Sequence, residues 1–193
     1  MIIYLHGFRS APASIKATAL RQHMADRGLA GRFWCEQLPV SPTAAIARLE
    51  AEIARARKAY PELTPTLVGS SLGGYYATWL AERHDLRAVL VNPAVVAALS
   101  LEPWLGWQDN LYTGERFELT RAHLDELRAI EVPCITRPQN FWLLVETGDE
   151  VLDYRDAVAK YAGARQTVLE GGDHGFSRWN DYLDDILAFA GLS

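Results

Sequence analysis

The chain has 193 residues, of which 49% are hydrophobic and 22% are charged, and its formal net charge is −5. This profile is typical of a globular protein with one core, and we expect one domain over residues 1–193. The mild acidity and the lack of a basic cluster exclude a nucleic-acid surface, and no apolar run approaches the roughly 18 residues of a membrane span. The start of the chain lacks the basic and apolar regions of a signal peptide, so we expect a cytoplasmic protein.

Strands and helices alternate along the chain. Strands are expected at residues 2–6, 33–38, 65–70, 86–91, 141–147 and 165–170. Helices are expected at residues 12–27, 42–60, 72–84, 153–162 and 178–190. This alternation predicts an α/β fold with a mostly parallel sheet of about six strands and helices on both faces.

One stretch of the chain does not follow this alternation of strands and helices. Residues 94–138 do not have the pattern of another strand–helix unit, so we expect a small cap-like insertion above the carboxyl edge of the sheet, with a helix that begins at Thr120.

The two cysteines, Cys35 and Cys134, are too few for a disulfide framework or a metal site. Cys35 lies in the expected strand 33–38 and is interpreted as a buried small side chain. No metal or cofactor is expected.

The most informative motif is Gly69-Ser70-Ser71-Leu72-Gly73, which lies between an apolar strand and a helix. Only Ser71 has glycines two positions before and two positions after it. Gly-x-Ser-x-Gly at a strand-to-helix turn is typical of an elbow that exposes a nucleophilic serine. The elbow strains the backbone, and a Cβ at either flanking glycine would crowd it. We therefore expect Ser71 to be a nucleophile.

The first strand ends in His6-Gly7-Phe8, and this turn is expected to supply one oxyanion donor. The donors would be the backbone N–H groups of Phe8 and of Leu72, the residue after the nucleophile. His6 and Arg9 flank the turn and are candidate substrate-binding residues, although a solvated side chain is the alternative for Arg9. The insertion adds Trp104 and Trp107, which line an acyl pocket or simply pack the insertion onto the body.

A general base and an acid are expected after Ser71 in the chain. His174 lies just past the last strand, as the order Ser, then acid, then His requires. Asp149 is the first carboxylate beyond strand 141–147 and would accept a hydrogen bond from the His174 Nδ1–H. Glu150 and Asp153 are neighbouring alternatives, and Asp149 could also serve only as a helix cap.

Several strings of residues spread over nearly the whole chain resemble the YqiA-like small bacterial esterases of the α/β-hydrolase superfamily. They are Ile3-Tyr4-Leu5-His6-Gly7-Phe8, Gly69-Ser70-Ser71-Leu72-Gly73-Gly74, Val91-Asn92-Pro93-Ala94, Tyr112-Thr113-Gly114-Glu115, Thr147-Gly148-Asp149-Glu150-Val151-Leu152-Asp153-Tyr154 and Gly171-Gly172-Asp173-His174. One position departs from the family pattern, because Gly175 follows the histidine where a serine is usual. The resemblance implies a compact α/β-hydrolase fold and a serine hydrolase without a cofactor.

The expected reaction is the cleavage of carboxylic esters, with a short or medium acyl group, through an acyl-enzyme on Ser71. An acyl thioesterase that uses the same triad is the alternative, and a non-catalytic binding module on a hydrolase fold is less favoured. The expected partner is a small-molecule acyl ester or thioester. The sequence leaves monomer and dimer open.

Overall fold

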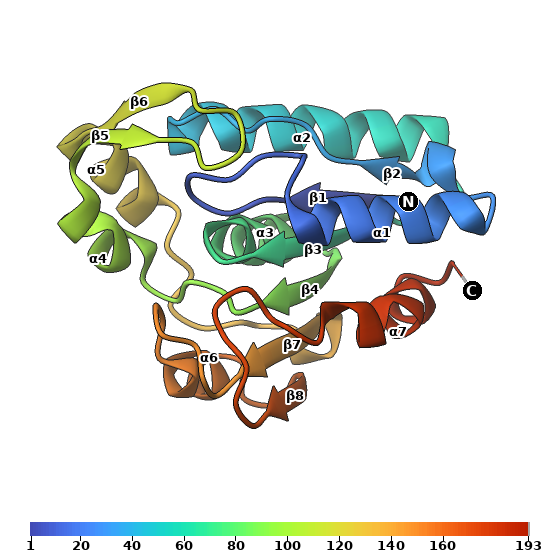
Figure 1. Cartoon of the computed structure of the whole chain (residues 1–193). Coiled ribbons are helices and arrows are strands. Elements are labelled where there is room, and N and C mark those ends of the chain that lie inside the picture. Colours follow the sequence, from blue (N-terminus) through green and yellow to red (C-terminus); the bar gives the residue numbers. More distant parts are fainter. Residues whose placement is uncertain (193) are drawn as a thin grey trace.

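A computed structural model of the chain describes residues 1–192 and contains a six-stranded parallel sheet (Figure 1). The strand order is β2-β1-β3-β4-β7-β8. The second strand of the chain forms one edge beside β1, and each later strand of this sheet is added on the other side. The strands are β1 (Ile2–Leu5), β2 (Phe33–Trp34), β3 (Thr66–Ser70), β4 (Arg87–Val91), β7 (Phe141–Glu146) and β8 (Arg165–Leu169). The predicted parallel sheet with helices around it is confirmed.

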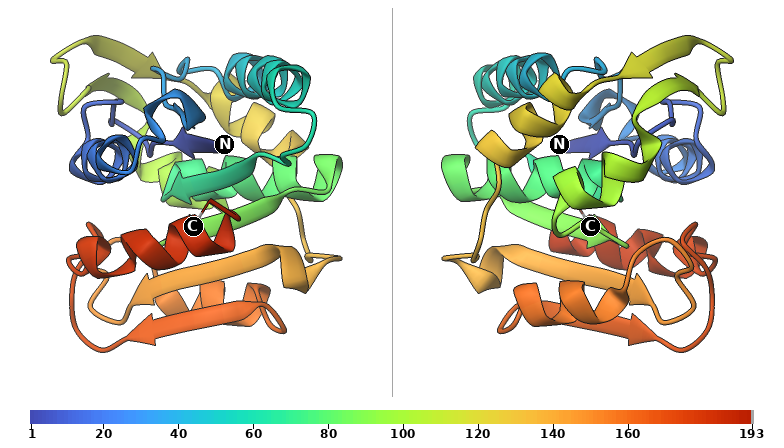
Figure 2. Two further views of the ribbon diagram at one scale, coloured as in Figure 1. Left: turned by 90° about the vertical axis from the view of Figure 1, so that its right-hand side faces the viewer. Right: turned by 90° about the vertical axis from the view of Figure 1, so that its left-hand side faces the viewer.

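Helices cover both faces of the sheet (Figure 2). Because side chains alternate along a strand, β1 sends Ile3 and Leu5 to one face and Ile2 and Tyr4 to the other. Helices α2, α3 and α6 pack on the first face, and α1 and α7 on the second. Their bounds are α1 (Ile15–Asp26), α2 (Pro42–Ala59), α3 (Leu72–His84), α6 (Tyr154–Lys160) and α7 (Leu183–Phe189). In residues 1–192 no helix is both long and apolar enough to cross a bilayer.

The second expected strand, 33–38, is much shorter in the structure. Strand β2 pairs with β1 only through Phe33 and Trp34. Beyond it the chain leaves the ladder, and the N–H of Leu38 donates instead to the His6 ring at 3.0 Å. Cys35 therefore lies outside the strand and is only partly buried. Burial raises the pKa of its thiol to about 12.

The insertion contains a β-hairpin that the sequence analysis did not predict. Strands β5 (Gly106–Asp109) and β6 (Arg116–Leu119) form a separate antiparallel pair. The hairpin lies between α4 (Ala97–Leu101) and α5 (Arg121–Ala129), and Figure 1 shows all four at the end of the sheet toward which the strands point. The expected helix opening at Thr120 is confirmed, with Thr120 as the N-cap of α5. The insertion thus stands over the carboxyl edge of the sheet.

Candidate active site

Ser71 occupies a strained turn between β3 and α3. Its φ of 54° and ψ of −119° lie outside the regions that L-residues favour. The flanking glycines make the turn possible, because a Cβ added at Gly69 would overlap the backbone carbonyl of Gly73. The Ser71 N–H donates to the Val91 carbonyl at 3.0 Å, which ties the elbow to the end of β4. The local sequence therefore folds into the elbow expected for an exposed nucleophile.

The structure brings Ser71, His174 and Asp149 into one line of hydrogen bonds. The Ser71 Oγ lies 3.1 Å from His174 Nε2, and His174 Nδ1 lies 2.8 Å from Asp149 Oδ2. The Asp149 side chain is 2% exposed and that of His174 is 22% exposed. A Nδ1–H held by a buried carboxylate leaves the lone pair of Nε2 facing the serine hydroxyl, which is the arrangement a general base needs.

The neighbouring carboxylates have partners other than the histidine ring, and Glu150 Oε2 accepts from the backbone N–H of His174 at 3.0 Å. The second oxygen of Asp149 accepts from the N–H groups of Val151 and Leu152, both at 2.9 Å, so the carboxylate is held from two sides. Asp153 is the N-cap of α6 and accepts from the Arg155 N–H. Of the three candidate acids after β7, Asp149 is the one that meets the histidine ring.

The N–H groups of Phe8 and Leu72 are the candidate oxyanion donors. Neither N–H has a hydrogen-bond acceptor among residues 1–192, and both residues line the same pocket. Gly7 lies against the nucleophile, since a Cβ added there would stand 3.7 Å from Ser71 Oγ. Two free amides beside a serine hydroxyl can stabilise negative charge that develops on a carbonyl oxygen.

His6 is buried beneath this turn. Its Nε2 accepts from the Leu38 N–H at 3.0 Å, so the proton of the neutral ring is on Nδ1, which donates to the Gly7 carbonyl at 3.0 Å. Burial lowers the pKa of the ring below its ordinary value, which keeps the ring neutral. The Gly7 carbonyl and the Phe8 N–H belong to one peptide plane, so this hydrogen bond also orients the Phe8 amide.

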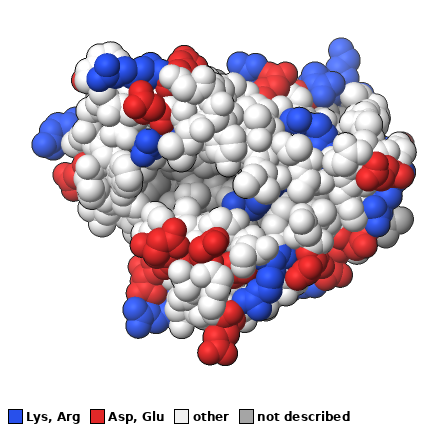
Figure 3. All heavy atoms as spheres, viewed as in Figure 1, with Lys and Arg blue, Asp and Glu red and all other residues white. Residues whose placement is uncertain are grey.

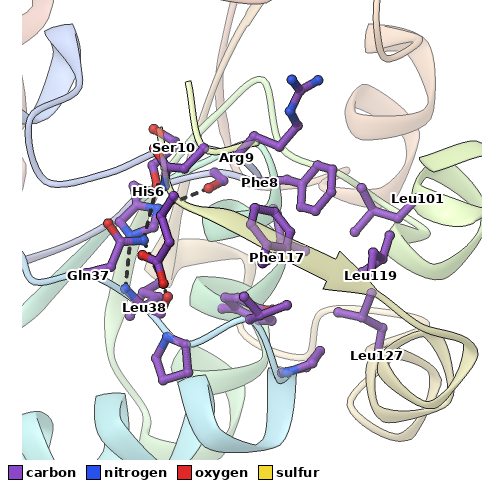
Figure 4. Close-up of a pocket in the computed structure, with 18 of the residues that line it drawn as sticks. His6, Phe8, Arg9, Ser10, Gln37, Leu38, Leu101, Phe117, Leu119 and Leu127 are labelled. Carbon is purple, nitrogen blue, oxygen red and sulfur yellow. Dashed lines mark hydrogen bonds between the residues drawn. The ribbon is translucent and has the colours of Figure 1, made fainter. Parts of the chain in front are cut away.

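A pocket of about 370 Å³ adjoins the two amides and lies between the body and the insertion. Figure 3 shows a hollow beside the insertion, walled mainly by uncharged atoms. One part of the pocket is apolar and the other carries polar groups, and Figure 4 shows these groups on opposite sides. In Figure 4 the apolar part contains Phe8, Leu101, Phe117, Leu119 and Leu127.

The remaining predicted substrate-binding residues are placed differently. Arg9 borders the pocket, but its Nε donates to the Asp109 carbonyl at 2.9 Å and its guanidinium lies 5.4 Å from the centre of the Trp104 ring. In Figure 4 this guanidinium points away from the apolar side chains. Trp104 and Trp107 do not belong to the pocket wall and are 41% and 59% exposed. The aromatic side chain that the insertion does bring to the pocket is Phe117.

Two residues near the site were not assigned a role from the sequence. Asn92 follows β4 with a φ of 40°, and its amide reaches the segment that carries His174. Glu146 ends β7 and is completely buried. Burial alone would raise the pKa of the Glu146 carboxyl, but hydrogen bonds from the N–H groups of Asp173 and Ser177 lower it below its ordinary value. A glutamate at the end of an otherwise apolar strand was the available signal.

A lysine approaches the same segment from α1. The Lys16 Nζ donates to the Gly175 carbonyl at 2.7 Å, one residue after the histidine. Burial lowers the pKa of this ammonium group, while the nearby carboxylates of Asp173, Glu146 and Asp149 act in the opposite direction. The site thus holds buried negative charge next to two partly buried cations, Lys16 and Arg178, whose Nε lies 3.2 Å from Glu146 Oε1.

Solved structures with the same architecture are α/β hydrolases. A candidate hydrolase from Agrobacterium vitis S4 is 22% identical with a TM-score of 0.71, covering 98% of this chain and 87% of that one. Mouse alpha/beta hydrolase domain-containing protein 10 is 17% identical with a TM-score of 0.71, covering 100% and 90%. The esterase domain of a Rhodothermus marinus protein is 18% identical with a TM-score of 0.67, covering 98% and 85%. At these identities the likeness establishes the α/β-hydrolase fold.

The family comparison covers almost the entire chain. The model of the uncharacterised protein family UPF0227 matches residues 1–191, which include the elbow, both oxyanion candidates and the segment that carries His174. This confirms the resemblance to the YqiA-like proteins that the motifs indicated. The chain therefore belongs to the UPF0227 family, on an α/β-hydrolase fold.

Proposed function

We propose that this protein is a serine hydrolase that cleaves carboxylic esters through an acyl-enzyme. The observation that carries the proposal is the hydrogen-bonded line from Ser71 Oγ through His174 to Asp149, with distances of 3.1 and 2.8 Å. This line ends at a strained serine beside a pocket that two free amides border. A structural serine needs neither the strain nor the buried acid, so the combination favours chemistry over packing.

In the proposed reaction, Ser71 attacks the ester carbonyl carbon while His174 Nε2 takes the hydroxyl proton. The carbonyl oxygen becomes an oxyanion between the N–H groups of Phe8 and Leu72, each contributing about 2.7–4 kcal/mol to transition-state stabilisation. The C–O bond to the alcohol then breaks, and His174 returns the proton to the leaving oxygen. Water, deprotonated by His174, then attacks the acyl carbon. The bond from this carbon to Ser71 Oγ breaks, His174 returns the proton to Oγ, and the acid is released. Asp149 stabilises the imidazolium form in both halves.

The shape and lining of the pocket favour a substrate whose apolar acyl group binds there. The two amides lie at its wall, so a carbonyl held there directs one substituent into the apolar part of the pocket. A volume of about 370 Å³ falls at the small end of ligand pockets, which favours short or medium acyl chains. Each buried methylene contributes about 0.8 kcal/mol of binding, enough to make the chain length matter.

The test is covalent labelling of the nucleophile. Wild type and Ser71→Ala are incubated with a fluorophosphonate, and intact mass is measured beside the hydrolysis of p-nitrophenyl esters of increasing acyl length. We expect one adduct on wild type, none on Ser71→Ala, and ester hydrolysis by wild type only. Ser100→Ala, which removes a hydroxyl on α4 that donates to the Val96 carbonyl and does not line the pocket, serves as a matched control and keeps the label.

Two results would overturn the proposal. Full ester hydrolysis by Ser71→Ala would remove the serine from the mechanism. An unlabelled, inactive wild type would instead favour a binding module on a hydrolase fold.

A further inference from the structure

The segment that carries His174, residues 170–178, contains neither helix nor strand. A histidine on such a segment has no regular backbone ladder to fix its position, yet a general base must be held to within a fraction of an ångström. The hydrogen-bond partners of this segment therefore decide where the ring lies. Several of them converge on one side chain, that of Glu146.

Glu146 receives donors from both sides of the histidine. Its Oε2 accepts from the N–H of Asp173 and from the N–H of Ser177, each at 2.9 Å. Its Oε1 accepts from the N–H and the Nε of Arg178, both at 3.2 Å, and from the Ser177 hydroxyl at 3.0 Å. The residue before His174 and the third residue after it are thus joined through one carboxylate that is 0% exposed.

The segment wraps closely around this carboxylate. A Cβ added at Gly172 would overlap the Glu146 side chain, and Gly172 has a φ of +73°. Backbone amides that converge on a buried anion form hydrogen bonds that are shorter and stronger than neutral ones. Glu146 therefore supplies hydrogen-bond acceptors to a segment that has no helix or strand hydrogen bonds of its own.

Two further side chains hold the segment: Glu150 Oε2 accepts from the His174 N–H at 3.0 Å, and Asn92 binds carbonyl groups. Its Nδ2 donates to the carbonyls of Asp173 and His174 at 3.0 and 3.1 Å, and its Oδ1 accepts from the Glu146 N–H at 3.1 Å. Asn92, after β4, thus binds backbone carbonyls next to the histidine, and Glu146, at the end of β7, binds backbone N–H groups. Asn92 and Glu146 are 2% and 0% exposed, so neither is placed to touch a substrate.

We infer that Glu146 is a positioning residue for the general base: its buried carboxylate holds residues 173–178 so that His174 Nε2 stays within reach of Ser71 Oγ. The inference rests on the proposed function for its catalytic consequence, and on the hydrogen bonds above for its structural part. A displacement of about 1 Å at a catalytic group can reduce turnover a hundredfold, so the carboxylate matters to rate without contacting the substrate.

The test is Glu146→Gln, which keeps the shape but turns an NH₂ group toward amide donors. We expect kcat for a p-nitrophenyl ester to fall about tenfold to a hundredfold, with KM unchanged because the pocket is untouched. Glu52→Gln is the matched control: Glu52 is also a buried carboxylate paired with an arginine, but it lies on α2. We expect this control to retain the kcat of wild type.

A second measurement does not depend on activity. Hydrogen–deuterium exchange should accelerate in residues 170–178 of Glu146→Gln and stay unchanged over the elbow, residues 69–75. Faster exchange in the segment with an unchanged kcat would overturn the positioning role. Unchanged exchange would overturn the structural part, whatever the kinetics.

A milder variant covers the case in which Glu146→Gln does not fold. Ser177→Ala removes only the hydroxyl donor, at an exposed residue. We expect kcat to fall by a few-fold at constant KM, and a kcat equal to that of wild type would contradict the inference. Activity that survives in Ser71→Ala would refute the proposed function instead, so the two failures are distinguishable.

Discussion

Gly73 stands directly against the backbone carbonyl of Leu5, so that a Cβ added to Gly73 would overlap the oxygen and carbon of that group. The contact joins the first turn of α3 to the end of β1. It sets the distance between the two segments that supply the candidate oxyanion amides, those of Leu72 and Phe8. Gly73, two residues after the nucleophile, therefore fixes the spacing of the site as well as permitting the turn.

Gly73→Ala should disrupt both stability and activity. The added methyl meets rigid backbone, so we expect a loss of about 2–3 kcal/mol in the free energy of unfolding or a failure to fold. Gly31→Ala is the matched control, because nothing lies within 4 Å of a Cβ there, and its effect should stay within about 0.5 kcal/mol. Urea unfolding of both variants provides the comparison. Equal stability of the two would show that the contact with Leu5 can relax.

Asp149→Asn should abolish most of the activity and leave the fold intact. The amide keeps an oxygen for the N–H groups of Val151 and Leu152 but presents NH₂ to the histidine ring. The ring would then accept at Nδ1 and carry its proton on Nε2, facing the serine. We expect kcat to fall by about 10³ to 10⁴ with the melting temperature nearly unchanged. A drop of less than tenfold would assign the acid role to another carboxylate.

Phe117→Ala should change the acyl-chain preference. Phe117 lines the apolar part of the pocket and packs edge-on against Phe8, with 5.7 Å between ring centres. Removal of the ring enlarges the pocket, so we expect kcat/KM for long acyl esters to rise about tenfold relative to short ones. Trp107→Ala removes an exposed aromatic from the partner strand of the same hairpin and should keep the wild-type ratio. Identical ratios in both variants would exclude Phe117 from the acyl site.

The proximity of the candidate site residues could be predicted because a parallel sheet brings the carboxyl ends of its strands to one edge. Ser71, Asp149 and His174 each follow a strand, so local patterns alone predicted that they would be near one another. Their hydrogen bonds agree with this prediction. The clearest strand patterns belong to β1 and β7, which are buried along their whole length.

The insertion was harder to predict because its strands have only four residues each and are half exposed. Alternation of Phe117 and Leu119 with polar neighbours was a hairpin signal, but a short one. Which aromatic faces the body depends on how the hairpin packs, and this placed Phe117 rather than Trp104 or Trp107 in the pocket wall. Glu146 was missed because its partners lie 27 to 32 residues away in the chain.

The buried ring of His6 should make stability depend on pH in a definite direction. Its pKa is lowered by burial from the ordinary value of 6.5, so the unfolded chain binds a proton that the folded chain does not. The stabilisation is fully present above pH 6.5 and is lost as the pH falls below it, at up to about 1.4 kcal/mol per pH unit. Protonation would also break the Leu38 N–H···Nε2 bond, since both ring nitrogens then donate.

His6→Gln removes this titration and tests the prediction. The free energy of unfolding should be measured by urea denaturation of wild type and variant between pH 5 and pH 8. We expect the variant to be less stable at pH 8 and the difference to shrink as the pH falls below 6.5, because only wild type loses the neutral ring. His23→Gln is the matched control, since His23 is partly buried but its ring meets the side chains of Asp184 and Arg27 rather than backbone groups. A difference between wild type and His6→Gln that stays constant over this range would show that the ring does not remain neutral in the folded protein.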